Sequence, residues 1–312
     1  MKRLRHTPEG FVKYMQMSSR SLFVFVEGTK VDRYFYSRIC GQVCSKKDVG
    51  YQAVAAAELD GSGGGKSRLL NFFKVLDGSG SLVSNFKGKK TTAIFFLDKD
   101  IDDILGRKVA SPHVVYTPTY DVEALIFQQG ELIGPAAAMA SMDPAELAGV
   151  LTDPHAWRVS CAERWKEWIV ICIFCMRQRV KNCANFHKHS QVNHISNGSS
   201  TGGLDGAKAA TYKTKIHKAS GLDAQKFERK YKAASRLVDY IFKTGRYHLV
   251  FKGKWYLPFL TSELSRIAGA KAFDRNAVDA GIVGALAYSL DYTAPWATPF
   301  AGGVEAVTSF LG

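Results

Sequence analysis

Acidic residues recur in this chain at one kind of position, the carboxyl end of a segment that predicts a β-strand. In an open α/β sheet, ligands bind beyond the carboxyl ends of the strands, so acids placed there can share one site. Several carboxylates at one rim repel one another unless a hard divalent cation joins them. The residues concerned are Glu27, then Asp98 and Asp100 with Asp102 and Asp103 just beyond them, then Asp121 and Glu123 at the start of a helix.

The chemistry that these carboxylates predict is metal-dependent cleavage of a phosphodiester. Mg²⁺, or Mn²⁺ in its place, is held by one or two carboxylates together with phosphate oxygens and water. Two such ions can bind the attacking and leaving oxygens of the reaction. A single aspartate after a strand is more often a helix cap or a turn residue. Three groups at the same kind of position favour a site instead.

The elements that would position these acids alternate between strands and helices. Apolar runs predict strands, helical patterns follow them, and unbroken apolar strands are typical of a parallel sheet covered on both faces. We therefore expect an α/β fold over residues 1–130 with a mostly parallel sheet flanked by helices. The predicted strands lie at 22–27, 51–58, 91–97 and 113–118, and the helical patterns at about 31–41, 66–76 and 120–129.

The character of the sequence changes after residue 131. Segments 134–151, 223–245 and 274–292 predict helices, whereas 184–221 is polar enough to predict a loop or a mobile segment. Asp223 is placed to cap its helix and Gly245 to end it. We expect residues 131–312 to form a mainly helical, basic domain that binds substrate and partner. The apolar tail after residue 293 is either core or an interface.

Positive charge is concentrated in one part of the chain. The formal net charge is +14, and residues 177–254 carry +13 of it, from seventeen basic and four acidic residues. Aromatic residues lie among these cations, which is typical of a nucleic-acid partner, although a solvated basic surface has the same composition. The candidate nucleic-acid contacts are Lys66, Arg177, Arg179, Lys181, Lys213, Lys215 and Lys254.

Targeting signals are not evident in the sequence. The N-terminus is basic, but no apolar stretch follows it as in a signal peptide. The longest apolar run, 168–176, has nine residues, against the roughly twenty that a membrane span needs. The six cysteines show no disulfide spacing. We expect a cytoplasmic protein with no membrane partner.

Three motifs resemble a TOPRIM domain: "FVEGTKVDRYFY", "FFLDKDID" and "YDVEALIF", in this order and at these spacings. TOPRIM is the Mg²⁺-binding α/β fold shared by primases, type IA and type II topoisomerases, and the OLD family of nucleases. The motifs cover residues 20–128, and the third is most similar to single-chain proteins related to the OLD nucleases. The length and the helical, basic second half resemble the TOPRIM effector subunits of PARIS anti-phage defence systems.

The resemblance implies roles for the acids. It makes Glu27 a metal ligand or general acid–base, and Asp98 and Asp100 a metal-binding pair. Glu123 would complete the acidic site, and Asp102 is a further candidate ligand.

Two departures and one addition accompany these roles. Asp32 stands one position later than the family's next aspartate, and Ala124 replaces an asparagine that is frequent after the last glutamate. OLD-type nucleases also use a lysine from outside the TOPRIM core to stabilise the transition state. Lys252 and Lys254 are the candidates here, although a basic turn between two strands is the simpler interpretation.

The stretch "DGSGGGKS", residues 60–67, has part of a phosphate-binding P-loop pattern. That pattern requires a glycine where Asp60 stands, and a carboxylate there would face the phosphate anions. We therefore expect no bound nucleotide. Glycine-rich loops follow the second strand in OLD-like TOPRIM proteins. Here the loop would let the backbone approach the site and place Lys66 near a phosphate.

The expected function is that of a Mg²⁺-dependent TOPRIM endonuclease, the toxic effector of an anti-phage defence system. The resemblance implies that a partner ATPase holds the effector inactive and that sensing of phage proteins releases it. The released chain would form a homodimer and cleave host RNA, namely tRNA, so that the infection aborts.

Other functions remain open from the sequence. An OLD-like DNA nuclease, or a repair or restriction enzyme, would use the same acids. A non-catalytic nucleic-acid-binding subunit would be indifferent to the change Glu27→Gln. A topoisomerase would need a tyrosine-bearing domain and far more chain, and a primase would normally add a zinc ribbon.

A zinc site is a separate possibility. Cys172, Cys175, Cys183 and His187 have a spacing that could bind zinc. The first two lie inside an apolar run, where cysteine behaves as a small hydrophobic residue.

Overall fold

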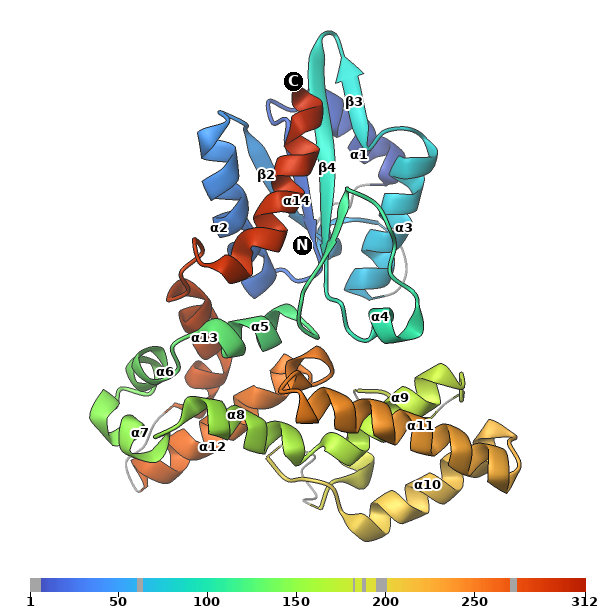
Figure 1. Ribbon diagram of the computed structural model, residues 1–312. Coiled ribbons are helices and arrows are strands. Elements are labelled where there is room, and N and C mark those ends of the chain that lie inside the picture. Colours follow the sequence, from blue (N-terminus) through green and yellow to red (C-terminus); the bar gives the residue numbers. More distant parts are fainter. Residues whose placement is uncertain (1–6, 61–63, 182, 187–188, 195–200, 270–273) are drawn as a thin grey trace. The chain divides into compact units, whose positions relative to one another are not determined.

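The computed structural model describes residues 7–60, 64–181, 183–186, 189–194, 201–269 and 274–312 (Figure 1). The chain divides into two compact units. The first, which we call the α/β unit, contains the chain up to Lys99, Lys108–Thr117 and Leu290–Gly312. The second, the helical unit, contains Asp100–Arg107 and Pro118–Ser289.

The division differs from the expected boundary at residue 130. Residues 118–130 belong to the helical unit, and the C-terminal tail returns to the α/β unit. The tail does so because it carries an apolar face: Phe300 is fully buried and its ring packs near that of Phe96 in the sheet, with 6.1 Å between centroids. The open question about the tail is therefore answered, since it is part of a core.

The α/β unit contains one mostly parallel sheet. Its strand order is β2-β1-β4-β3, with β5 also paired to β4. Strand β1 is parallel to β2 and β4, and β4 is parallel to β5. This confirms the predicted α/β class. The strands are β1 (Leu22–Val26), β2 (Tyr51–Ala55), β3 (Val83–Phe86), β4 (Lys89–Leu97) and β5 (Val114–Tyr116).

Strand β3 is the one strand of this sheet, among the described residues, that the sequence analysis missed. It pairs antiparallel with the first part of β4 through a two-residue turn, Lys87-Gly88, in which both residues have positive φ, 51° and 82°. This is the turn geometry that suits a tight hairpin. The strand is half exposed, so it lacks the apolar run by which the other strands were predicted.

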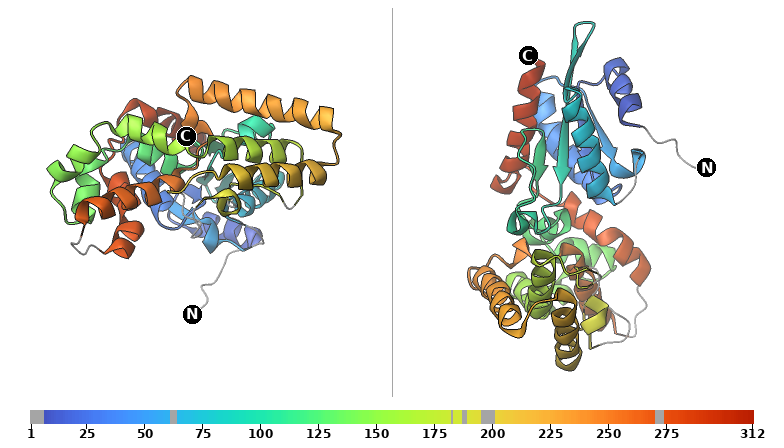
Figure 2. Two further views of the ribbon diagram at one scale, coloured as in Figure 1. Left: turned by 90° about the horizontal axis from the view of Figure 1, so that it is seen from below. Right: turned by 90° about the vertical axis from the view of Figure 1, so that its right-hand side faces the viewer.

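Helices cover both faces of the sheet (Figure 1, Figure 2). Successive side chains of a strand point to opposite faces. Phe25 and Phe95 stack at 4.6 Å on the face of α1 and α3, whereas Phe96 stacks on Tyr36 of α2 at 4.2 Å. The helices of this unit are α1 (Pro8–Met17), α2 (Val31–Lys46), α3 (Gly65–Gly78) and α14 (Thr298–Thr308).

The helical unit is built around α9 and α11. The apolar run of the sequence forms α9, whose residues from Trp168 to Cys175 are all buried. Its Phe174 packs on Phe227 of α11 at 5.0 Å. The helices of this unit are α4 (Asp102–Leu105), α5 (Val122–Gln129), α6 (Ile133–Met139), α7 (Pro144–Val150), α8 (Pro154–Glu163), α9 (Lys166–Arg177), α10 (Gly206–Ser220), α11 (Ala224–Lys243), α12 (Tyr256–Ala268) and α13 (Arg275–Tyr288).

Two segments of this unit test the sequence predictions directly. Helix α11 is confirmed: the Asp223 carboxylate accepts the Lys226 N–H, and Gly245 follows the helix with φ 69°. The prediction that 184–221 is a loop or mobile segment is wrong for α10. That helix has its own cap, Asp205, and buries Ala209, Tyr212 and Ile216 on one face. Its many lysines lie on the other faces and hide this stripe in the composition.

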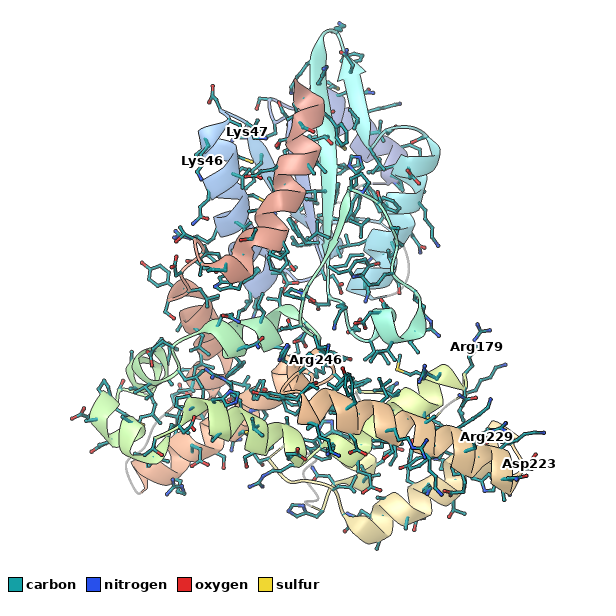
Figure 3. The ribbon with its side chains drawn as sticks, in the orientation of Figure 1. Lys46, Lys47, Arg179, Asp223, Arg229 and Arg246 are labelled. Carbon is teal, nitrogen blue, oxygen red and sulfur yellow. The ribbon has the colours of Figure 1, made fainter. Side chains whose placement is uncertain are left out.

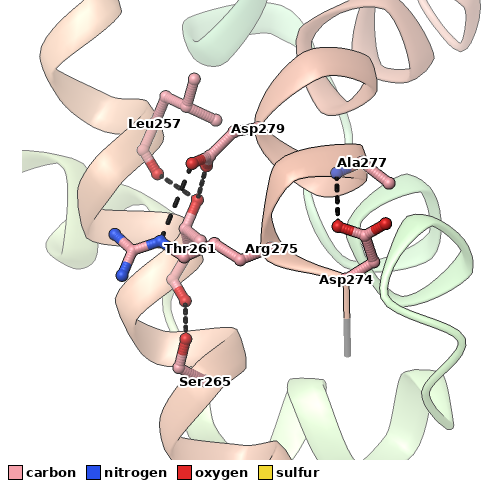
Figure 4. A network of polar contacts seen from close by, with 7 residues as sticks. All are labelled: Leu257, Thr261, Ser265, Asp274, Arg275, Ala277 and Asp279. Carbon is pink, nitrogen blue, oxygen red and sulfur yellow. Dashed lines mark hydrogen bonds and ion pairs between the residues drawn. The ribbon is translucent and has the colours of Figure 1, made fainter. Parts of the chain in front are cut away.

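Helices α12 and α13 are joined by a partly buried polar contact (Figure 4). The hydroxyl of Thr261 lies 2.6 Å from the Asp279 carboxylate and 2.9 Å from the Leu257 carbonyl. Arg275 lies 3.7 Å from the same carboxylate. Because a buried hydroxyl is costly without a partner, this contact favours one register of the two helices.

Among the described residues, no helix combines the length and apolar character that a membrane crossing requires.

Candidate functional site

Glu27 and Asp98 come together in the α/β unit. They follow β1 and β4, which are neighbouring parallel strands in register, with Val26 opposite Phe96. The Glu27 carboxylate accepts a hydrogen bond from the backbone N–H of Asp98 at 2.9 Å. Both residues are partly exposed. The two strand ends therefore place the Glu27 carboxylate next to the backbone of Asp98.

Asp32 holds the turn that carries Glu27. Its carboxylate accepts the N–H of Gly28 at 2.7 Å and is buried. A Cβ on Gly28 would lie 2.8 Å from that carboxylate, so a larger residue here would displace the Asp32 side chain. The one-residue displacement of Asp32 from the family pattern thus leaves it a positioning residue beside the site.

The end of the glycine-rich loop lies against Glu27. A Cβ on Gly65 would be 3.1 Å from the Glu27 carbonyl oxygen, closer than side chains normally approach. The next residue, Lys66, donates to the Lys99 carbonyl at 3.4 Å, and its ammonium lies 5.7 Å from the centre of the Tyr116 ring. Residues 61–63 of the loop lie outside the described residues. The described end of the loop thus brings backbone and a cation beside the strand-end acids.

Lys99 is a residue that the sequence analysis missed. It stands between Asp98 and Asp100, and it is 4% exposed. Its N–H donates to the Thr117 hydroxyl at 2.8 Å, which ties this turn to the end of β5. Lysine is rarely buried without a partner. The position of this lysine between two aspartates at a strand end is visible in the sequence and could have identified it.

A second group of acids lies in the helical unit, at the start of α5. Asp121 caps this helix by accepting the Ala124 N–H at 2.8 Å, and it also accepts the Gly253 N–H at 3.0 Å. Burial raises the pKa of Asp121 well above its usual range, and the charge of Glu123 raises it further. Asp121 therefore serves as the cap of α5. Glu123 instead pairs with a lysine, Lys254.

The segment Lys252-Gly253-Lys254 packs on the start of α5. A Cβ on Gly253 would overlap the Ala124 nitrogen and the Glu123 carbonyl carbon, so no larger residue fits. The Lys254 ammonium lies 3.3 Å from a Glu123 carboxylate oxygen. The alternative of a basic turn between two strands is wrong, because 3₁₀ turns at 247–249 and 253–255 lead into α12.

Lys252 has an unusual electrostatic environment. Burial lowers the pKa of its ammonium, and the nearby charge of Asp121 opposes that shift. Asp100 and Glu123 act on the pKa of Lys252 in the same direction as Asp121. A partly desolvated cation near three carboxylates can interact strongly with a further anion.

Asp100 and Asp102 belong to the turn that precedes α4. Asp100 has a left-handed backbone, with φ 50°, and its N–H donates to the Tyr120 carbonyl at 2.6 Å. Strained backbone of this kind is found at functional sites more often than elsewhere. Asp102 is the first residue of α4, and its carbonyl accepts the Arg107 N–H at 2.8 Å.

The donor atoms fit a hard divalent cation in type. Carboxylate oxygens are the ligands that Mg²⁺ and Mn²⁺ prefer, and a pair of them can suffice when water and phosphate supply the remaining positions. Within the described part of the chain, no three Asp, Glu, His or Cys side chains are grouped so that they alone could hold a metal. A metal held by these acids would therefore take its remaining ligands from substrate or solvent.

The predicted zinc ligands do not form a site among the described residues. Burial raises the pKa of the Cys172 thiol well above its usual range and that of Cys175 to about 12. Cys183 is also buried with a free thiol. His187 lies outside the described residues.

The predicted nucleic-acid contacts separate into two kinds. Lys213 forms an ion pair with Glu228 at 3.2 Å and lies 4.3 Å from the Tyr231 ring centre. Lys215 lies 5.4 Å from the Tyr212 ring centre. These two lysines have partners within the protein. In contrast, the residues at the end of α9 are exposed, namely Arg177, Arg179 and Lys181.

Comparison of the sequence with protein-family models and with curated proteins found no match. The α/β unit brings together Glu27 and Asp98 with Lys66. The helical unit brings Glu123 together with Lys252 and Lys254.

Proposed function

We propose that this chain is a metal-dependent endonuclease that cleaves phosphodiester bonds of RNA. The observation that carries the proposal is the bond from the Asp98 N–H to the Glu27 carboxylate, 2.9 Å long, between the ends of two parallel strands. A structural cap or turn acid normally bonds to its own segment. These two acids meet instead at a sheet edge where α/β proteins bind ligands.

The proposed metal ligands are Glu27, Asp98, Asp100 and Glu123, with Asp102 as a further candidate. A bound Mg²⁺ or Mn²⁺ would supply positive charge that activates water and stabilises the charge of the phosphate oxygens. No nucleotide cofactor is part of the proposal.

The lysines of the helical unit have separate roles in the proposal. Lys252 is the cation that stabilises developing negative charge, because its partial burial strengthens its electrostatic interactions. Lys254 orients Glu123 through their 3.3 Å ion pair, whose acidic partner is only 12% exposed.

The biological setting comes from the resemblance to TOPRIM effectors of PARIS systems. We propose a toxic effector of anti-phage defence that a partner ATPase holds inactive and then releases. The active form is a homodimer that cleaves host tRNA and thereby aborts the infection. The net charge of +13 over residues 177–254 supports a polyanionic substrate of this kind.

The test is cleavage of labelled total tRNA and of plasmid DNA by the purified chain with Mg²⁺, Mn²⁺ or EDTA. We expect cleavage of tRNA with metal only, and losses of about a hundredfold or more in Glu27→Gln and Asp98→Asn. Glu305→Gln is the matched control, because it makes the same chemical change at an exposed residue of α14 in the same unit. Its activity should equal that of the wild type.

Each result of this test decides a question. Cleavage of DNA alone would support the alternative of an OLD-like DNA nuclease or a repair or restriction enzyme. Cleavage that persists in Glu27→Gln would reject the proposed site. If the chain alone cleaves nothing, the assay is repeated after co-expression with the partner ATPase, and failure there rejects the nuclease.

A second candidate function is a non-catalytic nucleic-acid-binding subunit. The observation that favours it is that the described residues contain no group of three metal-binding side chains. Such a subunit would bind tRNA equally well as wild type and as Glu27→Gln, with EDTA as with Mg²⁺.

A further inference from the structure

The helical unit contains a groove that the proposed cleavage site does not use. Its volume is about 510 Å³, and it lies where the end of α9 meets α4 and α11. A second hollow of about 410 Å³ is lined in part by the same residues, Arg107, Met176 and Arg179, so the two are adjacent. Together they follow the end of α9.

Among the described residues, every charged side chain that lines this groove is positive. Arg107 comes from the end of α4, Arg177 and Arg179 from the end of α9, and Lys230 from α11. Lys181 lines the second hollow. No Asp or Glu is among the described residues that line either hollow. The groove therefore gathers cations from three separate elements.

The arginines of the groove have no anionic partner among the described residues. Within the described part of the chain, the side chains of Arg107, Arg177 and Arg179 form no hydrogen bond or ion pair. Lys230 donates to the neutral side chain of Gln178 at 2.5 Å. Arginines near a helix C-terminus can simply complement its dipole. That explanation does not apply to Lys230, which lies in the middle of α11.

Arg179 stands where a glycine would be easier to accommodate. Its φ is 54°, the left-handed backbone that commonly ends a helix and is usually adopted by glycine. The N–H of Arg179 donates to the Met176 carbonyl and that of Val180 to the Cys175 carbonyl, so the turn is a regular helix ending. Arginine is therefore less favourable than glycine for the backbone conformation at this position.

Apolar side chains also line the groove. Ile104, Leu105 and Phe174 line it together with small residues of α11. Apolar side chains beside cations suit the sugar or base of a nucleotide better than they suit a free inorganic anion.

We propose that this groove binds the phosphodiester backbone of the RNA substrate, at a site separate from the acidic residues. Arg107, Arg177 and Arg179 contact phosphates, Lys230 adds a fourth positive charge, and the apolar side chains contact the nucleotides. The assignment of RNA as the polymer rests on the proposed function. The groove would hold the substrate while the acids act on another part of it.

The test measures binding without cleavage. Fluorescein-labelled total tRNA is titrated with the full chain in EDTA at several KCl concentrations, and anisotropy gives the Kd. We expect Arg107→Ala and Arg177→Ala each to weaken binding by about tenfold. Each should also reduce the slope of log K against log salt by about 0.7 to 0.9.

Two further variants separate binding from folding and from net charge. Arg179→Gly should weaken binding similarly while its thermal midpoint stays equal or rises, because glycine accepts the left-handed backbone. Lys230→Ala is compared with Arg229→Ala, the adjacent exposed residue of α11 that does not line the groove (Figure 3). Both variants lose one charge, but only Lys230→Ala should weaken binding.

The proposal is overturned if the groove variants bind tRNA as the wild type does, or if Arg229→Ala and Lys230→Ala weaken it equally. It is also overturned if polyphosphate at the same phosphate concentration displaces tRNA completely, because the site would then be a general anion site. These outcomes are independent of cleavage. A chain that binds tRNA through the groove but never cleaves it would keep this proposal and reject the nuclease.

Discussion

The acids of the α/β unit and those of the helical unit are held in place by different means. Glu27 and Asp98 follow neighbouring strands in register, and the Glu27 carboxylate accepts the backbone N–H of Asp98. Asp121 and Glu123 depend instead on Gly253, which donates to Asp121 from 132 residues away. The first group should therefore tolerate local change, whereas the second should be sensitive to a single added methyl group.

The most severe way to test this difference is Gly253→Ala. The new Cβ would overlap backbone atoms of residues 123 and 124, which cannot move without shifting α5. We expect the free energy of unfolding to fall by about 3 kcal/mol, as in strongly overpacked interiors. Denaturant unfolding of the whole chain, followed by circular dichroism, measures it.

Gly284→Ala is the control for that experiment. This glycine lies in α13 of the same unit, and a Cβ there would meet nothing within 4 Å. Alanine should raise the stability by about 0.5 to 1 kcal/mol, because glycine is a poor helix former. Equal effects of the two alanines would show that the contact of Gly253 with α5 does not hold that unit together.

The same contrast shows what the sequence could predict. Strands β1 and β4 and helix α11 were predicted because each has a local apolar pattern that its own segment satisfies. Helix α10 was missed because its three buried residues are outnumbered by lysines, and the half-exposed β3 has no apolar run.

Local sequence patterns could not predict the contacts of the site between residues that are far apart in the chain. A glycine between Lys252 and Lys254 is visible in the sequence, but nothing local shows that it packs on residues 121–124. The same limit applies to the return of residues 290–312 to the sheet, which depends on the fit of Phe300 between α2 and β4. The roles of the acids in catalysis stay predictions.

The second prediction concerns the buried cap of α5. Asp121→Ala removes an acceptor from two backbone N–H groups inside the protein. We expect a loss of about 2 kcal/mol in the free energy of unfolding, because a lost cap and an unsatisfied buried donor add together. Asp121→Asn keeps one oxygen acceptor and should cost less, which the same unfolding experiment checks.

The pH dependence of Asp121→Asn sharpens this prediction. The pKa of Asp121 is raised in the folded protein, so the folded state keeps its proton when the unfolded chain loses it near pH 4. The advantage of the wild type over Asp121→Asn should therefore be largest at low pH and should shrink as the pH rises through the folded pKa. Urea unfolding of both proteins across this range measures the difference.

Asp205, the cap of α10, should behave in the opposite way. The N–H of Lys208 lowers the pKa of this exposed carboxyl, so its contribution is present above the unfolded pKa and is lost as the pH falls. The advantage of the wild type over Asp205→Asn should grow with pH. If the advantage of the wild type changed with pH in the same direction for both caps, the burial of Asp121 would not control its pKa.

The smallest expected effect is in the α/β unit, where Asp32→Ala leaves the Gly28 N–H without its acceptor. We expect the free energy of unfolding to fall by about 1 kcal/mol, because the Gly28 N–H is only partly buried and water can replace the carboxylate as its acceptor. Asp77→Ala, at an exposed position of α3 in the same unit, should change stability by less than about 0.5 kcal/mol. A loss in Asp32→Ala as large as that in Gly253→Ala would mean that the strand-end acids also depend on one contact, and the contrast between the two groups would disappear.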